Sequence, residues 1–81
     1  MARMRILSAS GDVAVEWDEK RAEVGDPEAL DAVREAERIF DEQRQRGATA
    51  FKVEPGKPAE RLDVFDPKVE QTIIVPRVAG G

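Results

Sequence analysis

The last seven residues of the chain are the part of the sequence whose composition points to chemistry. They read Val75-Pro76-Arg77-Val78-Ala79-Gly80-Gly81. Proline interrupts strand pairing, and the small residues after it have little apolar area with which to offset the entropy cost of ordering. Because glycine has no Cβ, an extended Gly80-Gly81 backbone can pass through a narrow channel toward the catalytic groups of another protein. The sequence therefore predicts a free tail that presents two glycines.

The rest of the composition leaves this chain few means of catalysis. Its 81 residues include no Cys and no His. Disulfides, thiolate metal ligands and Cys nucleophiles are thereby excluded, as are the usual general base and the commonest metal ligand. The carboxylates are too scattered to suggest a metal cage. We therefore expect neither an enzyme nor a metal site.

Charge and hydropathy argue against nucleic acid and membrane partners. Thirteen basic and seventeen acidic residues give a net charge of -4, the wrong sign for binding a phosphate backbone. No run approaches the roughly 18 apolar residues that span a bilayer, and Met1 to Met4 lack the apolar stretch of a secretion signal. We expect a cytoplasmic protein with one domain over residues 1–76 and a flexible diglycine tail over residues 77–81.

A long amphipathic helix is predicted from Pro27 to Arg46. Asp26 can accept hydrogen bonds from the first turn, and Pro27 at the first helical position loses no bond. Gly47 is the expected C-terminal cap. When this segment is wound as a helix at about 100° per residue, its apolar and its charged side chains fall on opposite faces. The apolar face is centred on Ala29, Val33, Ala36 and Phe40, and the expected charge pairs are Arg34 with Glu37 and Arg38 with Asp41.

Five strands are predicted around this helix. The first, Met4 to Ser8, should be buried on both faces because Ile6 and Leu7 point in opposite directions. The last, Gln71 to Pro76, carries a β-branched run typical of a central, doubly covered strand. The others are the alternating segment Val13 to Trp17 after a turn at residues 10–12, the segment Thr49 to Glu54, and a short strand with Leu62 and Val64.

This order, β-β-α-β-β-β, fits a mixed sheet whose first and last strands lie side by side at the centre, crossed on one face by the helix. If those two strands are parallel, the connection between the two halves of the chain is a right-handed crossover. An open meander with the helix packed across it is the alternative. The predicted core contains Trp17, Phe40, Phe51 and Phe65, and the Trp17 indole N–H needs a hydrogen-bond partner there.

The element order and the tail together resemble the ubiquitin-like β-grasp family, an α+β fold with a mixed sheet of four to five strands crossed by one long helix. Val78-Ala79-Gly80-Gly81 looks like the ending of molybdopterin-synthase small-subunit and ThiS-type sulfur carriers. Arg77 is similar in character to the arginine-bearing tail of ubiquitin. The helix is long for the family, and the sequence between Gly47 and Gln71 matches the loop pattern of neither subgroup.

The resemblance implies that an E1-like enzyme adenylates the Gly81 carboxylate with MgATP, so that the partner uses the nucleotide and this chain binds no cofactor. Gly80 and Gly81 would form the acyl-transfer terminus, and Arg77, Val78 and Ala79 would be recognised by that enzyme. Attack by a target lysine would give an isopeptide-linked modifier, with an E2-like conjugating enzyme and a deconjugating protease as further partners.

Two other functions stay open. Attack by a persulfide on the activated end would make the chain a sulfur carrier with a C-terminal thiocarboxylate. A plain interaction module would have a chemically inert tail. If the chain is a modifier, its candidate acceptors for further copies are Lys20, Lys52, Lys57 and Lys68.

Overall fold

The computed structural model of the chain describes residues 1–8 and 11–77. Five strands form one sheet in the order β2-β1-β5-β3-β4, in which β1 and β5 are parallel and the other neighbours antiparallel. The elements are β1 (Ala2–Ile6), β2 (Val13–Trp17), α1 (Glu19–Glu23), α2 (Pro27–Gln45), β3 (Thr49–Lys52), β4 (Glu60–Leu62) and β5 (Gln71–Val75).

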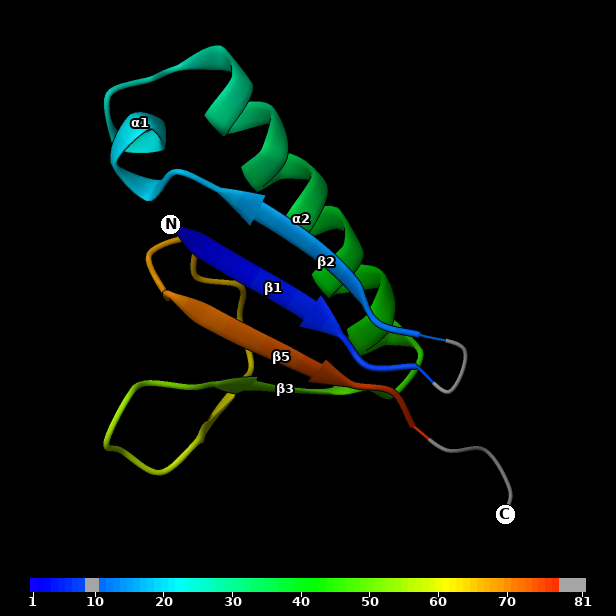
Figure 1. Cartoon of the computed structure of the whole chain (residues 1–81). Helices are drawn as coiled ribbons and strands as arrows, with labels where there is room; N and C mark the ends of the chain where they lie inside the picture. The colour runs from blue at the N-terminus through cyan, green and yellow to red at the C-terminus, as the bar shows by residue number, and fades with distance from the viewer. Residues whose placement is uncertain (9–10, 78–81) are drawn as a thin grey trace.

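The long helix α2 packs on one face of this sheet (Figure 1). The molecule is therefore an α+β, β-grasp-like fold, as predicted. The parallel pairing of the first and last strands at the centre confirms the expected topology and rules out the open meander. No helix within residues 1–8 and 11–77 has the length and apolar character that crossing a membrane requires.

Helix α2 begins at Pro27 as predicted and ends at Gln45, one residue earlier than predicted, so its C-terminal cap is Arg46 and not Gly47. The Asp26 carboxylate accepts a hydrogen bond from the Ala29 N–H at 3.1 Å, and Pro27 occupies the first turn. Arg46 caps the C-terminal end, and Gly47 follows with φ of +90°. This left-handed conformation is one that glycine adopts without a Cβ penalty.

The predicted charge pairs on α2 are wrong. Arg34 lies 3.9 Å from Asp31, and Arg38 forms ion pairs with both Glu35 and Glu42. In the pairs with Asp31 and Glu35 the acid precedes the base along the helix. This is the orientation that the helix dipole favours, and Glu42 adds a partner at the i+4 spacing.

Strand β1 starts two residues earlier than predicted and is buried on one face only. Ala2, Met4 and Ile6 point into the core, whereas Arg3 is exposed and forms an ion pair with Glu16 on β2. The prediction of burial on both faces is therefore wrong. The physical reason is that α2 covers one face of the sheet and leaves the other open.

Two segments between the main elements also differ from the prediction. The polar stretch after β2 forms the short helix α1, capped by Asp18, whose carboxylate accepts hydrogen bonds from the N–H groups of Lys20 and Arg21. None of the residues in α1 is buried, so it gives no apolar periodicity. Strand β4 covers Glu60–Leu62, and Val64 lies outside it with 76% of its surface exposed.

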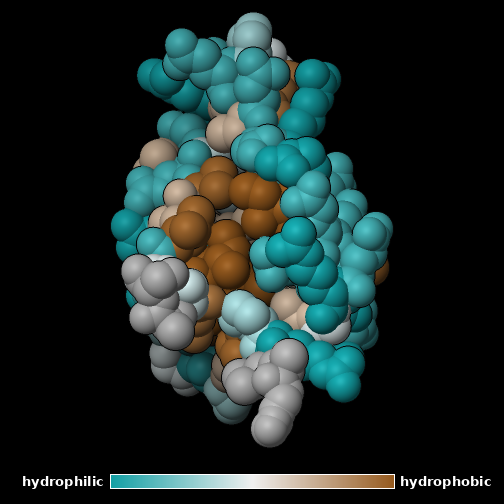
Figure 2. Space-filling model, turned by 90° about the vertical axis from the view of Figure 1, so that its right-hand side faces the viewer, coloured by the Kyte–Doolittle hydropathy of each residue, from teal (hydrophilic) through white to brown (hydrophobic). Residues whose placement is uncertain are grey.

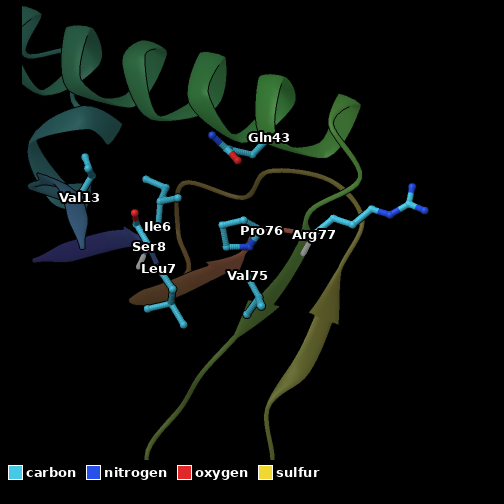
Figure 3. A pocket seen from close by; sticks show the side chains of 8 residues that line it. All are labelled: Ile6, Leu7, Ser8, Val13, Gln43, Val75, Pro76 and Arg77. Atoms are coloured by element: carbon cyan, nitrogen blue, oxygen red, sulfur yellow. The ribbon is translucent and has the colours of Figure 1, made fainter. Parts of the chain in front are cut away.

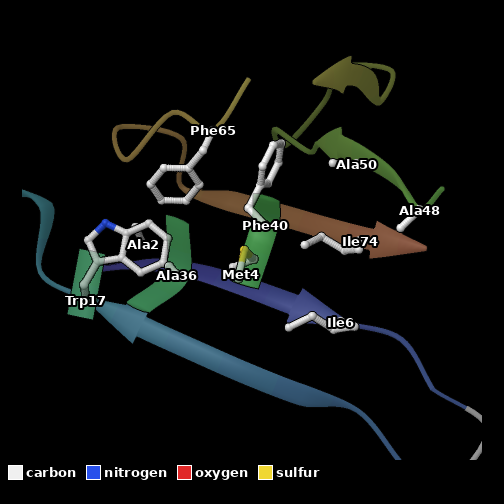
Figure 4. Close-up of a cluster of buried hydrophobic side chains, with 10 residues drawn as sticks. All are labelled: Ala2, Met4, Ile6, Trp17, Ala36, Phe40, Ala48, Ala50, Phe65 and Ile74. Atoms are coloured by element: carbon white, nitrogen blue, oxygen red, sulfur yellow. The ribbon is translucent and has the colours of Figure 1, made fainter. Parts of the chain in front are cut away.

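The core lies between α2 and the inner face of the sheet (Figure 4). The ring of Phe65 lies 5.7 Å from the rings of both Trp17 and Phe40. The Trp17 indole N–H donates to the Pro67 carbonyl oxygen at 3.0 Å, which supplies the partner that burial requires. Phe51 is only partly buried on the outer face, opposite Ile73, so its assignment to the core is wrong.

Candidate functional site

The candidate site is the point at which the chain leaves the sheet. Of the predicted site residues, the structure describes Arg77, which is exposed. Val78, Ala79, Gly80 and Gly81 lie outside the described residues. The described part of the site is therefore the root of the tail, residues 75–77.

The root is held at the centre of the sheet. Strand β5 lies between β1 and β3, as predicted, and its residue Ile74 is fully buried. The prediction that β5 is covered on both faces is wrong, because Val75 on the other face is 39% exposed. The Leu7 N–H donates to the Ile74 carbonyl oxygen at 3.0 Å on one side, and Val75 faces Thr49 on the other. Pro76 then follows without an N–H to continue the pairing. This arrangement fixes where the tail starts.

A shallow hollow of about 640 Å³ adjoins the root (Figure 3). Gln43 projects from the last turns of α2 above Ile6 and Pro76, whereas Leu7 and Val75 point to the opposite side of the sheet. The lining is mostly apolar and comes from segments far apart in the chain. Its residues are Ile6, Leu7, Ser8, Val13, Gln43, Val75, Pro76 and Arg77.

Val13 shows why the hollow exists. It is paired with Ile6, so its side chain is on the core face of the sheet, yet 58% of its surface is exposed. Further along β2 on the same face, Trp17 is only 2% exposed. The core is therefore uncovered at the end of the sheet from which the tail starts. Figure 2 shows a hollowed apolar area on this side of the molecule.

The Arg77 side chain lies against the C-terminal end of α2. A Cβ placed on Gly47 would be 3.0 Å from Cδ of Arg77, so the absence of a side chain at Gly47 makes room for it. Within the described residues, neither Arg77 nor the neighbouring Arg46 side chain forms an ion pair. Two unpaired cations thus lie at this corner of an otherwise acidic protein.

The lysines differ in their surroundings. Lys52 Nζ lies 3.3 Å from a Glu60 oxygen and 3.6 Å from a Glu54 oxygen. A hydrogen bond to Glu60, and then the charges of Glu60 and Glu54, raise the pKa of the Lys52 ammonium. Lys57 pairs with Glu54 at 3.2 Å. Lys20 and Lys68 are exposed and form no ion pair within the described part of the chain.

The sequence predicts Arg77 as a site residue, which stays a prediction, but it does not predict the hollow beside Arg77. No side chain of the hollow has an unusual type, and periodicity assigns Ile6 and Val13 to the core. Val13 is the first residue of the second strand and pairs with Ile6, the last residue of β1. Because β1 and β5 are parallel, Ile6 lies beside the end of β5, and Val13 is thereby brought near the start of the tail. The hollow can therefore be predicted only when the pairing of the strands is known.

Within residues 1–8 and 11–77, no cluster of three or more acidic side chains is arranged to hold a metal ion. The site combines an apolar hollow with the Arg77 guanidinium group, which forms no ion pair among the described residues, at the start of the tail. No family model matches the chain, and no curated protein and no solved structure matches it either.

Proposed function

We propose that this chain is a ubiquitin-like protein whose Gly81 carboxylate is adenylated by an E1-like enzyme and then conjugated to lysines of target proteins. The observation that carries the proposal is the junction of β5 and the tail. The Val-Ala-Gly-Gly sequence lies two residues beyond the central strand of a β-grasp-like sheet, after Pro76, which ends the pairing, and Arg77. Such a junction holds the start of the tail firmly on a rigid body.

Activation solves a problem of the leaving group. A free carboxylate is a poor acyl donor because oxide would have to leave. In the proposed first step a Gly81 carboxylate oxygen attacks the α-phosphorus of ATP, and pyrophosphate leaves. In the second step a lysine amine, directly or through an enzyme-bound thioester, replaces AMP at the Gly81 carbonyl and loses a proton. Dividing the reaction in this way is the logic of covalent catalysis.

The chain itself would be the acyl group that is transferred. It has no Cys to carry a thioester and no His to act as a base. The partner enzymes supply both functions, together with MgATP. What this chain provides is a rigid body, a tail that starts at a fixed point, and the side chains around that point.

The proposal is tested by ATP–pyrophosphate exchange. Each E1-like adenylating enzyme of the source organism is purified and incubated with the full chain, MgATP and labelled pyrophosphate. We expect one enzyme to give exchange that depends on this chain and is lost when Gly80 and Gly81 are deleted. Equal exchange with the full and the shortened chain would contradict the proposal.

Intact-mass spectrometry of the products then separates the possible outcomes. Conjugation appears as the mass of the chain, less one water, added to a lysine of another protein. A sulfur carrier would instead gain the mass difference between sulfur and oxygen at its own C-terminus. An inert interaction module would show neither change, and its binding to a partner would survive deletion of residues 78–81.

A further inference from the structure

We infer that the hollow at the root of the tail is the docking site for the adenylating enzyme, which inserts an apolar side chain between Ile6, Val13 and Pro76 and places acidic groups against Arg46 and Arg77. This inference rests on the proposed function. It adds a binding surface on the folded body to the chemistry proposed for the tail.

The first argument is the reach of the tail. In the proposed reaction the reacting carboxylate belongs to Gly81, four residues beyond Arg77. Four extended residues span at most about 14 Å. An enzyme whose active site holds the Gly81 carboxylate must therefore bring its own surface against the end of the sheet around Arg77. The hollow opens at this end, and Pro76 and Arg77 form part of its lining.

The second argument is the exposed apolar surface. Val13 is 58% exposed although it is on the core face of the sheet, and the half-buried Pro76 also lines the hollow. Apolar side chains that are exposed together around a concave surface are typical of a protein interaction site. Two other valines are more exposed, Val24 and Val64, but neither lines this hollow. Covering the hollow would bury apolar area where the core of the domain is open.

The third argument is charge. The chain has a net charge of -4, and most of its described basic side chains are paired with carboxylates. Within residues 1–8 and 11–77, Arg46 and Arg77 form no ion pair. Arg46 directly precedes Gly47 at the end of α2, and the Arg77 side chain lies against Gly47. A partner surface with acidic groups around an apolar side chain complements this corner. Such complementarity steers association and fixes the orientation of the docked proteins.

The experiment compares two matched valine variants in the exchange assay. Val13→Glu places a charge in the hollow, and Val64→Glu makes the same change at an exposed site outside it. We expect Val13→Glu to raise the KM of the adenylating enzyme about tenfold and to leave kcat nearly unchanged, as loss of an interface anchor does. Val64→Glu should leave both constants unchanged. Thermal melts of both variants verify that they are folded.

A charge variant and a binding measurement complete the test. Arg46→Glu should also raise KM, whereas Arg34→Glu, on the exposed face of α2, should not. The chain that lacks Gly80 and Gly81 should still compete with the wild type for the enzyme, and should lose this ability when Val13→Glu is added. This competition reports docking without requiring chemistry at the tail.

The possible results separate docking from the proposed function. If the wild type supports exchange and Val13→Glu behaves like Val64→Glu, the docking site is wrong and the proposed function stands. An equal rise of KM in Val13→Glu and Val64→Glu would also overturn the docking site, because the effect would not be specific to the hollow. If no adenylating enzyme gives exchange with the wild type, the proposed function fails, and the docking site fails with it.

Discussion

Arg77 lies against the bare backbone of Gly47, so that a Cβ on Gly47 would approach Cδ of Arg77 to 3.0 Å. This contact joins the start of the tail to the C-terminal end of α2. Gly47 thus satisfies two requirements, a left-handed φ of +90° at the helix end and space for the arginine side chain. Any other residue at position 47 would meet both penalties.

Replacing Gly47 with alanine should therefore destabilise the domain more than the same change at Gly25. Gly25 has a similar φ of +84°, but nothing lies within 4 Å of a Cβ placed there. The backbone penalty alone is about 1 kcal/mol in each case. Denaturant unfolding should show a larger loss for Gly47→Ala, and adding Arg77→Ala should remove the excess. Equal losses at the two glycines would show that the contact with Arg77 carries no energy.

The indole N–H of Trp17 ties β2 to the loop that precedes β5. Trp17→Phe removes the 3.0 Å hydrogen bond to the Pro67 carbonyl oxygen and shrinks a side chain that is 2% exposed. We expect a loss of about 2–3 kcal/mol in the free energy of unfolding, from the unpaired carbonyl and the smaller ring together. Phe51→Leu, on the partly exposed outer face, is the control and should cost clearly less.

The sequence predicts the main elements because their signals are local. Asp26, Pro27 and Gly47 mark the ends of α2, and the β-branched run at Ile73 and Ile74 marks the central strand. Helix α1 has a cap but no buried residue, so no apolar pattern reveals it. Phe51 alternates like a core residue, and only the position of α2 shows that its face of the sheet is uncovered.

The candidate site also has a part that the sequence suggests and a part that only the fold reveals. Arg77 is a candidate from the sequence because it belongs to the segment that contains the diglycine motif, and its role stays a prediction. The hollow could not, because Ile6, Val13, Gln43 and Pro76 come from four segments that meet only in the folded chain. Its apolar residues also look like ordinary core residues. Val13 is exposed because of how these segments meet, and no periodicity of a single segment contains that information.

Thr72 offers a substitution that should stabilise the protein. Its side chain is 1% exposed, and its hydroxyl oxygen has no hydrogen-bond partner among the described residues. Thr72→Val keeps the shape and removes a polar group whose desolvation is not compensated, so stability should rise by about 1 kcal/mol. Denaturant unfolding measures the gain. Thr49→Val, at a half-buried site, is the control and should change stability less. A loss of stability in Thr72→Val would show that the hydroxyl is paired.

The cap of α1 should be lost in acid. Hydrogen bonds from backbone N–H groups, that of Arg21 first, hold the pKa of the Asp18 carboxyl below its ordinary value of 3.8. Because the unfolded chain takes up the proton at higher pH, the contribution of the cap to stability is complete above that value. It disappears as the pH falls through the lower pKa of the folded state.

NMR titration of the Asp18 carboxyl should accordingly show a midpoint below 3.8, together with loss of helical shifts in α1 at lower pH. Asp18→Asn keeps an acceptor oxygen but cannot titrate, so its α1 shifts should be independent of pH over this range. A normal midpoint for Asp18 would contradict the hydrogen bonds of the cap.

If the chain is conjugated to further copies of itself, the acceptor lysines should be Lys20 and Lys68 rather than Lys52. The neutral amine is the nucleophile, and Glu60 and Glu54 raise the pKa of Lys52 and thus lower its neutral fraction. Trypsin cuts after Arg77, so a modified lysine would keep a Val-Ala-Gly-Gly remnant that mass spectrometry detects. Lys52→Arg should leave the yield unchanged, whereas Lys20→Arg with Lys68→Arg should lower it, with any remaining adducts on Lys57. Adducts found mainly on Lys52 would show that its ion pairs do not protect it.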